Sequence, residues 1–186
     1  RRSSDLTKDL TNLLPDDLTA EFANGVLDSC KLGDEIAYFP VALQPQAIIY
    51  RKDRFKEAGL EIPKTWDEFV ECAKALTKDT DGDGEVDQWG FGMVGSNNSS
   101  GQSRFMSYLW SNGVDCVTDT DGKWDTDLKA DNKTFTDAFE KWTKMNDDGI
   151  VPIGITEVDY PTAANYFAMG YTSMFMTGSN ALGDRK

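Results

Sequence analysis

Histidine is absent from the 186-residue sequence. Its absence excludes Ser-His and Cys-His nucleophiles and the usual catalytic zinc sites, because all of these use an imidazole as base or ligand. An enzyme built from this chain would have to work with carboxylates, as glycoside hydrolases do. No acidic residue lies in an apolar motif that would indicate the buried, raised-pKa acid of such an enzyme. We therefore predict that the protein is not an enzyme.

Cysteines are few, and long hydrophobic runs are missing. Cys30, Cys72 and Cys116 have no metal-ligand spacing, and an odd number cannot fully pair, so small buried residues are the simplest interpretation. No apolar run approaches the roughly 20 residues that a membrane span needs. The polar stretch from Arg1 to Ser4 does not predict a signal peptide.

Positive charge is also scarce, since 19 Lys and Arg stand against 32 Asp and Glu, for a net charge of −13. The electrostatic field of this negative charge repels phosphate backbones and anionic membranes, so nucleic acid is predicted not to be a partner. It favours divalent cations wherever carboxylates gather. Hydrophobic residues make up 39% of the chain, which is enough for one compact domain with a core.

Strand-like and helix-like segments alternate along the chain, which predicts an α/β layered fold. The clearest helix begins at Thr65, where Thr65 and Glu68 form a capping-box pair. The sequence Asp119 to Gly122 predicts a hairpin turn. We expect a polar loop over Ser96 to Ser103, and core positions for Trp66 and Trp110. The predicted strands are 46–51 (buried), 89–94 and 171–176, and the predicted helices are two within 1–30, then 52–58, 65–76, 104–111, 135–145 and 160–167.

The acidic loop, residues 79–87, is the strongest chemical signal. Calcium requires about six to eight oxygen ligands, and loops supply them from carboxylates at alternate positions. Position twelve, where an EF-hand carries a bidentate Glu, is Gly90, so the loop is EF-hand-like only. The sequence predicts a structural Ca²⁺ site, and the alternative is a solvated acidic turn. The predicted ligands are Asp79, Asp81, Asp83, Glu85 (through its backbone carbonyl), Asp87 and Gln88.

Several motifs follow one another in a familiar order. Tyr38 to Pro40 precedes Ile48 to Leu60, and Pro63 to Phe69 then precedes the acidic loop. Further motifs are Trp89 to Gly92, Trp110 to Gly113, Tyr160 to Gly170, Met174 and Gly178. Together, over roughly residues 30–182, they resemble family 1 extracellular solute-binding proteins, the maltose-binding-protein-like proteins of ABC importers.

The resemblance implies a fold of the periplasmic-binding-protein type II, in which two α/β lobes close over a solute. It implies that residues 1–42 are the tail of the first lobe and the hinge approach, that 43–182 form the second (C-terminal) lobe, and that 183–186 begin a crossover. A complete member is about twice this length, so a fragment is expected. The resemblance also implies an extracellular protein, periplasmic or lipid-anchored. Its partners would be the membrane subunits of an ABC transporter, and we expect a monomer.

The expected cargo is a sugar or a similar polar solute. Sugar sites need aromatic faces for CH surfaces and amide or carboxylate groups for hydroxyls. By its place in the family pattern, Tyr160 resembles a cleft tyrosine, and Asn180 stands where many sugar-binding members carry a stacking tryptophan, which argues against a maltodextrin. Gln102 and Ser103 are expected to border the cleft, and Gln44 and Gln46 lie near the hinge. The alternatives are a peptide or polyol binder and a calcium-dependent, dockerin-like interaction module, although such modules duplicate the loop that occurs once here.

Overall fold

The computed structural model describes residues 8–23, 25–121 and 123–179. The chain divides into two compact units, Arg1–Pro45 and Gln46–Lys186, and each is described by itself. The assignment of the chain to two lobes with a boundary at 42/43 stays a prediction, and residues 183–186 lie outside the described residues. No helix in the described part is long and apolar enough to cross a membrane.

The N-terminal unit contains short elements and little core. Helix α1 spans Asp16–Ala20 and the 3₁₀ turn η2 spans Asp28–Cys30, where the sequence predicted two helical segments. A small antiparallel hairpin pairs β1 (Lys31–Leu32) with β2 (Glu35–Ile36). Ile36 is the one fully buried side chain among the described residues of this unit.

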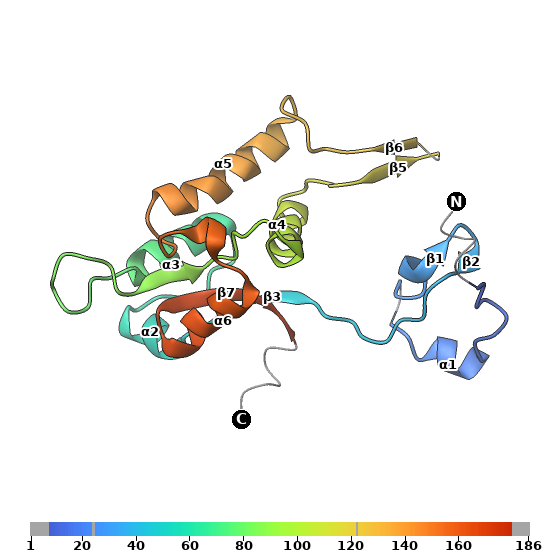
Figure 1. Ribbon diagram of the computed structural model, residues 1–186, viewed down its shortest axis with the longest axis horizontal. Helices are drawn as coiled ribbons and strands as arrows, with labels where there is room; N and C mark the ends of the chain where they lie inside the picture. The colour runs from blue at the N-terminus through green and yellow to red at the C-terminus, as the bar shows by residue number, and fades with distance from the viewer. Residues whose placement is uncertain (1–7, 24, 122, 180–186) are drawn as a thin grey trace. The chain divides into compact units, whose positions relative to one another are not determined.

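The C-terminal unit is built on a three-stranded sheet of order β3-β7-β4, shown in Figure 1. Strand β3 (Gln46–Tyr50) pairs with β7 (Thr172–Gly178) in antiparallel register, and β4 (Trp89–Gly92) pairs with β7 in parallel register. All seven residues of β7 are buried, as expected of a central strand covered on both faces. The strand predicted over 46–51 is present, but its burial was wrongly predicted: β3 is an edge strand whose residues are exposed or half-buried.

Helices cover both faces of this sheet. Because side chains alternate along a strand, Met174 and Met176 of β7 join the larger core, while Phe175 joins the smaller one. The larger core includes Phe69, Tyr108 and Trp142 from helices α3 (Trp66–Leu76), α4 (Ser99–Ser111) and α5 (Lys133–Asp147). The smaller core lies against α6 (Tyr160–Met169), which follows the 3₁₀ turn η3 (Ile155–Glu157). The α/β prediction is confirmed.

Short sequence motifs correctly predicted where several of these elements begin, end or turn. Thr65 Oγ1 accepts a hydrogen bond from the Glu68 N–H at 3.2 Å, and the Glu68 carboxylate accepts one from the Lys64 N–H at 2.7 Å. Helix α2 (Lys52–Glu57) ends before Gly59, as predicted. Strands β5 (Thr118–Thr120) and β6 (Lys123–Asp125) form the predicted hairpin, which extends away from the sheet in Figure 1.

Two predictions around α4 were wrong. Residues 96–103 are not all loop, because Asn98 Oδ1 accepts hydrogen bonds from the N–H groups of Ser100 and Gly101 and starts the helix at Ser99. Trp110 is not a core residue but is 54% exposed. Tyr108 and Leu109 face the core, and each step along a helix turns the side chain by roughly 100°.

Candidate functional site

The carboxyl ends of two parallel strands define the candidate site. Strands β4 and β7 run in the same direction, so both end at one edge of the sheet. The chain leaving β4 lies against the segment before α6, because the N–H groups of Gly95 and Ser96 both donate to the Val158 carbonyl at 3.1 Å. The first residues of α4 and of α6 are therefore brought to this edge. In open α/β sheets, ligands bind outside the carboxyl ends of the strands.

Three side chains meet there, and we call Arg104, Tyr160 and Thr177 the Arg104 corner. Arg104 is only 7% exposed, and its Cζ lies 4.5 Å from the centroid of the Tyr160 ring. The Tyr160 hydroxyl and Thr177 Oγ1 are 3.1 Å apart and share a hydrogen bond. Burial lowers the pKa of Arg104 from its usual value, and the nearby Tyr160 opposes that change. A guanidinium keeps its charge in proteins, so the corner holds a buried cation.

The structure brings together some of the residues predicted to bind solute. Tyr160 is half-buried at the start of α6, Ser103 is half-buried in α4, and Gln102 is exposed one residue earlier. Ser103 Oγ donates to the Ser100 carbonyl at 3.1 Å and accepts from Arg104 Nη1 at 3.1 Å. Contact of these residues with a solute stays a prediction.

The other predicted solute ligands are not placed in this group. Gln44 is exposed in the N-terminal unit, whose position relative to the sheet is not described. Gln46 is exposed at the start of β3, where it pairs with Gly178 of β7. Asn180 lies outside the described residues. Arg104 and Thr177 were missed altogether. The signal for Thr177 was a polar residue inside a largely apolar strand, whereas Arg104 follows a run of polar residues and had no such signal.

A cavity of about 370 Å³ adjoins the beginning of α4. Asn97, Asn98 and Gln102 supply polar groups to its wall, and Phe105 and Trp142 supply apolar surface. The Ser96 hydroxyl, also in this wall, is buried without a hydrogen-bond partner in the described structure. The cavity therefore combines amides, a free hydroxyl and aromatic surface close to Gln102.

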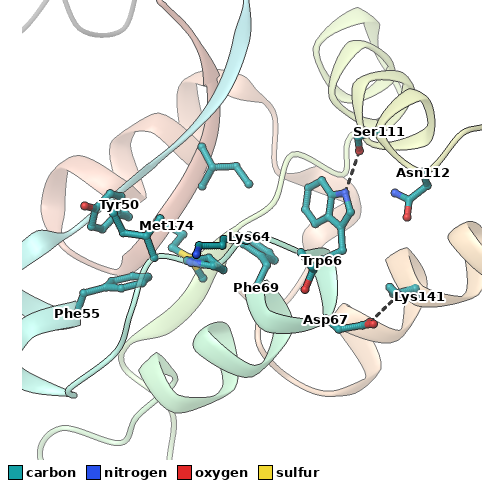
Figure 2. A pocket seen from close by; sticks show the side chains of 14 residues that line it. Tyr50, Phe55, Lys64, Trp66, Asp67, Phe69, Ser111, Asn112, Lys141 and Met174 are labelled. Carbon is teal, nitrogen blue, oxygen red and sulfur yellow. Dashed lines mark hydrogen bonds and ion pairs between the residues drawn. The ribbon is translucent and has the colours of Figure 1, made fainter.

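A second cavity, of about 620 Å³, is separate from the Arg104 corner and is shown in Figure 2. Tyr50, Phe55 and Phe69 give it an aromatic lining. Trp66, predicted to be a core residue, is half-buried in its wall and donates from Nε1 to Ser111 Oγ at 2.9 Å. No residue of the Arg104 corner lines this cavity.

In the acidic loop, carboxylate oxygens of Asp79, Asp81 and Asp87 lie within 4.8 Å of one another. The Asp79 carboxylate accepts hydrogen bonds from the Gly82 N–H at 2.6 Å and the Gly84 N–H at 2.8 Å. Asp87 Oδ2 accepts from both the N–H and the hydroxyl of Thr80 at 2.8 Å, and these bonds lower the pKa of Asp87 below its usual 3.8. Three oxygen ligands for a hard cation are thus held together at the surface.

The remaining predicted calcium ligands lie outside this group of three. Asp83 Oδ1 accepts from the Glu85 N–H at 2.8 Å, and both residues are exposed. Gln88 is buried, and its Nε2 donates to the Leu76 carbonyl at 2.7 Å, which fixes the side chain against the end of α3. Calcium binding by the loop stays a prediction.

Solved structures with similar folds include solute-binding proteins of ABC transporters and sugar-binding proteins. One from Agrobacterium radiobacter, in complex with ribitol, is 25% identical with a TM-score of 0.79, and the match covers 97% of this chain and 44% of that one. A maltose-bound MalE protein from T. maritima is 25% identical with a TM-score of 0.77, over 94% of this chain and 42% of that one. The fold is accordingly that of the type II periplasmic binding proteins.

Two curated relatives of this chain are also named as binding proteins. A fructooligosaccharide ABC transporter substrate-binding protein from Streptococcus pneumoniae is 28% identical, over 69% of this chain and 26% of that protein. A putative binding protein from Brucella abortus is 25% identical, over 92% of this chain and 39% of that protein. The chain thus spans less than half the length of these relatives. The family model for bacterial extracellular solute-binding proteins matches residues 3–185, and the chain therefore belongs to that family.

Proposed function

We propose that the chain forms part of the solute site of an extracellular binding protein that delivers a sugar or polyol to an ABC importer. The observation that carries the proposal is the meeting of Ser103, Tyr160 and Thr177, connected through Arg104, at the carboxyl edge of β4 and β7. Gln102 lies next to Ser103 in α4, in the wall of the cavity at the start of that helix. Relatives and neighbours named for fructooligosaccharide, ribitol and maltose support the solute class.

The chemistry of this edge suits a polyhydroxylated solute. The Gln102 amide offers both donors and an acceptor, and the half-buried Ser103 hydroxyl can exchange hydrogen bonds with sugar hydroxyls. Thr177 is buried, and its hydroxyl holds the Tyr160 hydroxyl instead. Tyr160 contributes an aromatic ring of the kind that packs on the CH faces of sugars. No single lobe encloses a solute in such proteins, so capture would follow closure, in which the solute shifts the equilibrium toward a closed state.

The proposal extends to the setting of the protein. It would act outside the cytoplasmic membrane, in the periplasm or lipid-anchored, as a monomer that docks on the membrane subunits of the importer. No catalytic step is proposed, because the family is one of binding proteins. A peptide solute is the alternative to test next if no sugar or polyol of the panel below stabilises the protein.

The test is thermal unfolding of the protein as its host produces it, against a panel of monosaccharides, oligosaccharides and polyols. A solute at a hundred times its Kd should stabilise the protein by about 2.7 kcal/mol. Gln102→Ala should weaken this stabilisation, because Gln102 is exposed at the proposed site. Glu140→Ala, at an exposed position of α5, should leave it unchanged. No shift with any sugar or polyol, or chemical turnover of the solute, would contradict the proposal.

We also propose that the acidic loop binds a structural Ca²⁺. The grouping of Asp79, Asp81 and Asp87 supports this, since three carboxylates so close repel one another unless a cation compensates. The cation would connect Asp79, just beyond α3, to Asp87, just before β4, and so stiffen that connection. The interaction-module alternative is not proposed, because the family match spans the loop and its surroundings alike.

A further inference from the structure

Arg104 contacts its own helix and two elements, α6 and β7, that are far from it in the sequence. Within α4, its Nη1 donates to the Ser100 carbonyl at 2.8 Å and to Ser103 Oγ at 3.1 Å. Its Nε donates to the Met176 carbonyl of β7 at 3.3 Å. Its guanidinium also lies over the ring of Tyr160, the first residue of α6, with Cζ 4.5 Å from the centroid. One side chain therefore joins the start of α4, the end of β7 and the start of α6.

The chemistry of arginine explains how one side chain does this. The guanidinium is planar, with N–H donors in a fixed fork, and its flat face stacks on aromatic rings. At 7% exposure Arg104 has little room for other rotamers, so its bonds define one orientation. The Tyr160 ring is confined in turn, by the guanidinium on its face and by the hydroxyl bond to Thr177. An ammonium group has no planar fork and could not make this set of contacts together.

We infer that Arg104 is a positioning residue, which fixes the orientation of the Tyr160 ring and of the first turn of α4 relative to β7. The expected effect of Arg104 on solute affinity rests on the proposed function. A cation over an aromatic ring and a hydrogen bond from a charged donor are among the stronger side-chain contacts, so their loss should free the Tyr160 ring and the first turn of α4. Loss of the guanidinium should therefore weaken solute binding by about tenfold, which corresponds to about 1.4 kcal/mol.

Arg54 provides a matched control. It is a half-buried arginine, and like Arg104 it contacts the α6–β7 region, through Ser173 Oγ at 2.9 Å and the Gly170 carbonyl at 2.5 Å. These contacts lie at the other end of β7 from Thr177. Arg54→Met should therefore lower stability without altering the Arg104 corner.

The first measurement needs no solute. The protein as its host encodes it is labelled with 3-fluorotyrosine, and the ¹⁹F NMR signal of Tyr160 is assigned from its disappearance in Tyr160→Phe. Arg104→Met should shift and broaden this signal, while Arg54→Met should leave it unchanged. An unchanged signal in a folded Arg104→Met protein would overturn the inference, whatever the protein binds.

The second measurement is a double-mutant cycle on the Kd of a solute from the panel. If Arg104 acts through Tyr160, Arg104→Met should weaken binding about tenfold in the wild-type background but less than about twofold in Tyr160→Ala. Additive losses would mean that Arg104 touches the solute directly and would overturn the positioning role. If the wild-type protein binds no solute of the panel, the proposed function is contradicted but the inference about Arg104 is not. The ¹⁹F signal tests that inference without a solute.

Discussion

The acidic loop and the Arg104 corner differ in how far apart in the sequence the partners of their charged side chains lie, and in how deeply those side chains are buried. In the loop, the carboxylates of Asp79, Asp83 and Asp87 accept hydrogen bonds from residues at most seven apart in the sequence, and most of the loop is exposed. In the corner, Arg104 is buried, and its bond to Met176 spans 72 residues. The loop is thus a local structure that a cation can complete from solvent. The corner exists only after α4, α6 and β7 have packed together.

The two regions should therefore respond differently to the same change. Damage to the loop should affect calcium binding and the stability that calcium adds, but not solute binding. Damage to the corner should affect folding and solute binding together. The predictions below test this difference.

Exchanging one glycine in each region should give the largest effect. A Cβ at Gly101, in the first turn of α4, would lie 2.2 Å from the Ser96 carbonyl oxygen, so Gly101→Ala should destabilise the protein by about 3 kcal/mol. A Cβ at Gly84, in the loop, meets nothing within 4 Å, and Gly84→Ala should cost only about 1 kcal/mol for its φ of +96°. Urea unfolding with calcium chelated measures both. Equal losses would mean that the two regions are equally constrained.

Calcium should act on the loop alone. At a hundred times its Kd, Ca²⁺ should stabilise the protein by about 2.7 kcal/mol, visible as a raised Tm that a chelator reverses. Asp81→Asn should remove the effect, because Asp81 belongs to the group of three carboxylates. Asp131→Asn, an equal change of charge at an exposed turn, should retain it, as should Arg104→Met. A full calcium shift in Asp81→Asn would place the ion elsewhere.

Substitutions at two helix caps should distinguish an effect on protein stability from an effect on solute binding. Asn98 caps α4 beside the corner, and Thr65 caps α3 away from it. Asn98→Ala and Thr65→Ala should each cost about 1 kcal/mol in unfolding experiments. Only Asn98→Ala should also weaken solute binding, because it frees the first turn of α4, which carries Gln102. Equal loss of solute affinity in both variants would show that affinity follows global stability.

The smallest effect concerns pH. Hydrogen bonds from Thr80 lower the folded-state pKa of Asp87 below 3.8. A depressed carboxyl pKa stabilises the fold above its unfolded value, and this contribution disappears as pH falls through the lower folded value. Below about pH 4, in chelator, Asp87→Asn should therefore lose stability less steeply with pH than the wild type. Arg104→Met should keep the wild-type slope, since a guanidinium does not titrate there. Identical slopes for wild type and Asp87→Asn would contradict this role of Thr80.

Much of the fold was predictable where neighbours in sequence decide the structure. The Thr65 cap, the helix ends before Gly59 and Gly170, and the turn at Asp121 each depend on a few adjacent residues. The start of α4 was missed, although Asn98 is a local signal, because the serine-rich sequence after it also suits a loop. The edge position of β3 could not be predicted, since an apolar run looks the same at the edge and in the centre of a sheet.

The sequence by itself determined the family, through motifs in a fixed order, and the composition of the acidic loop, through carboxylates at alternate positions. Only the tertiary structure decided that Gln88 is buried with its amide bonded to the Leu76 carbonyl, and not grouped with Asp79, Asp81 and Asp87. It alone joined Arg104 to Tyr160 and Met176. The physical reason is that neighbouring residues determine local hydrogen bonds and backbone angles. Contacts across the sheet depend instead on how β4 and β7 align and on which helices cover them.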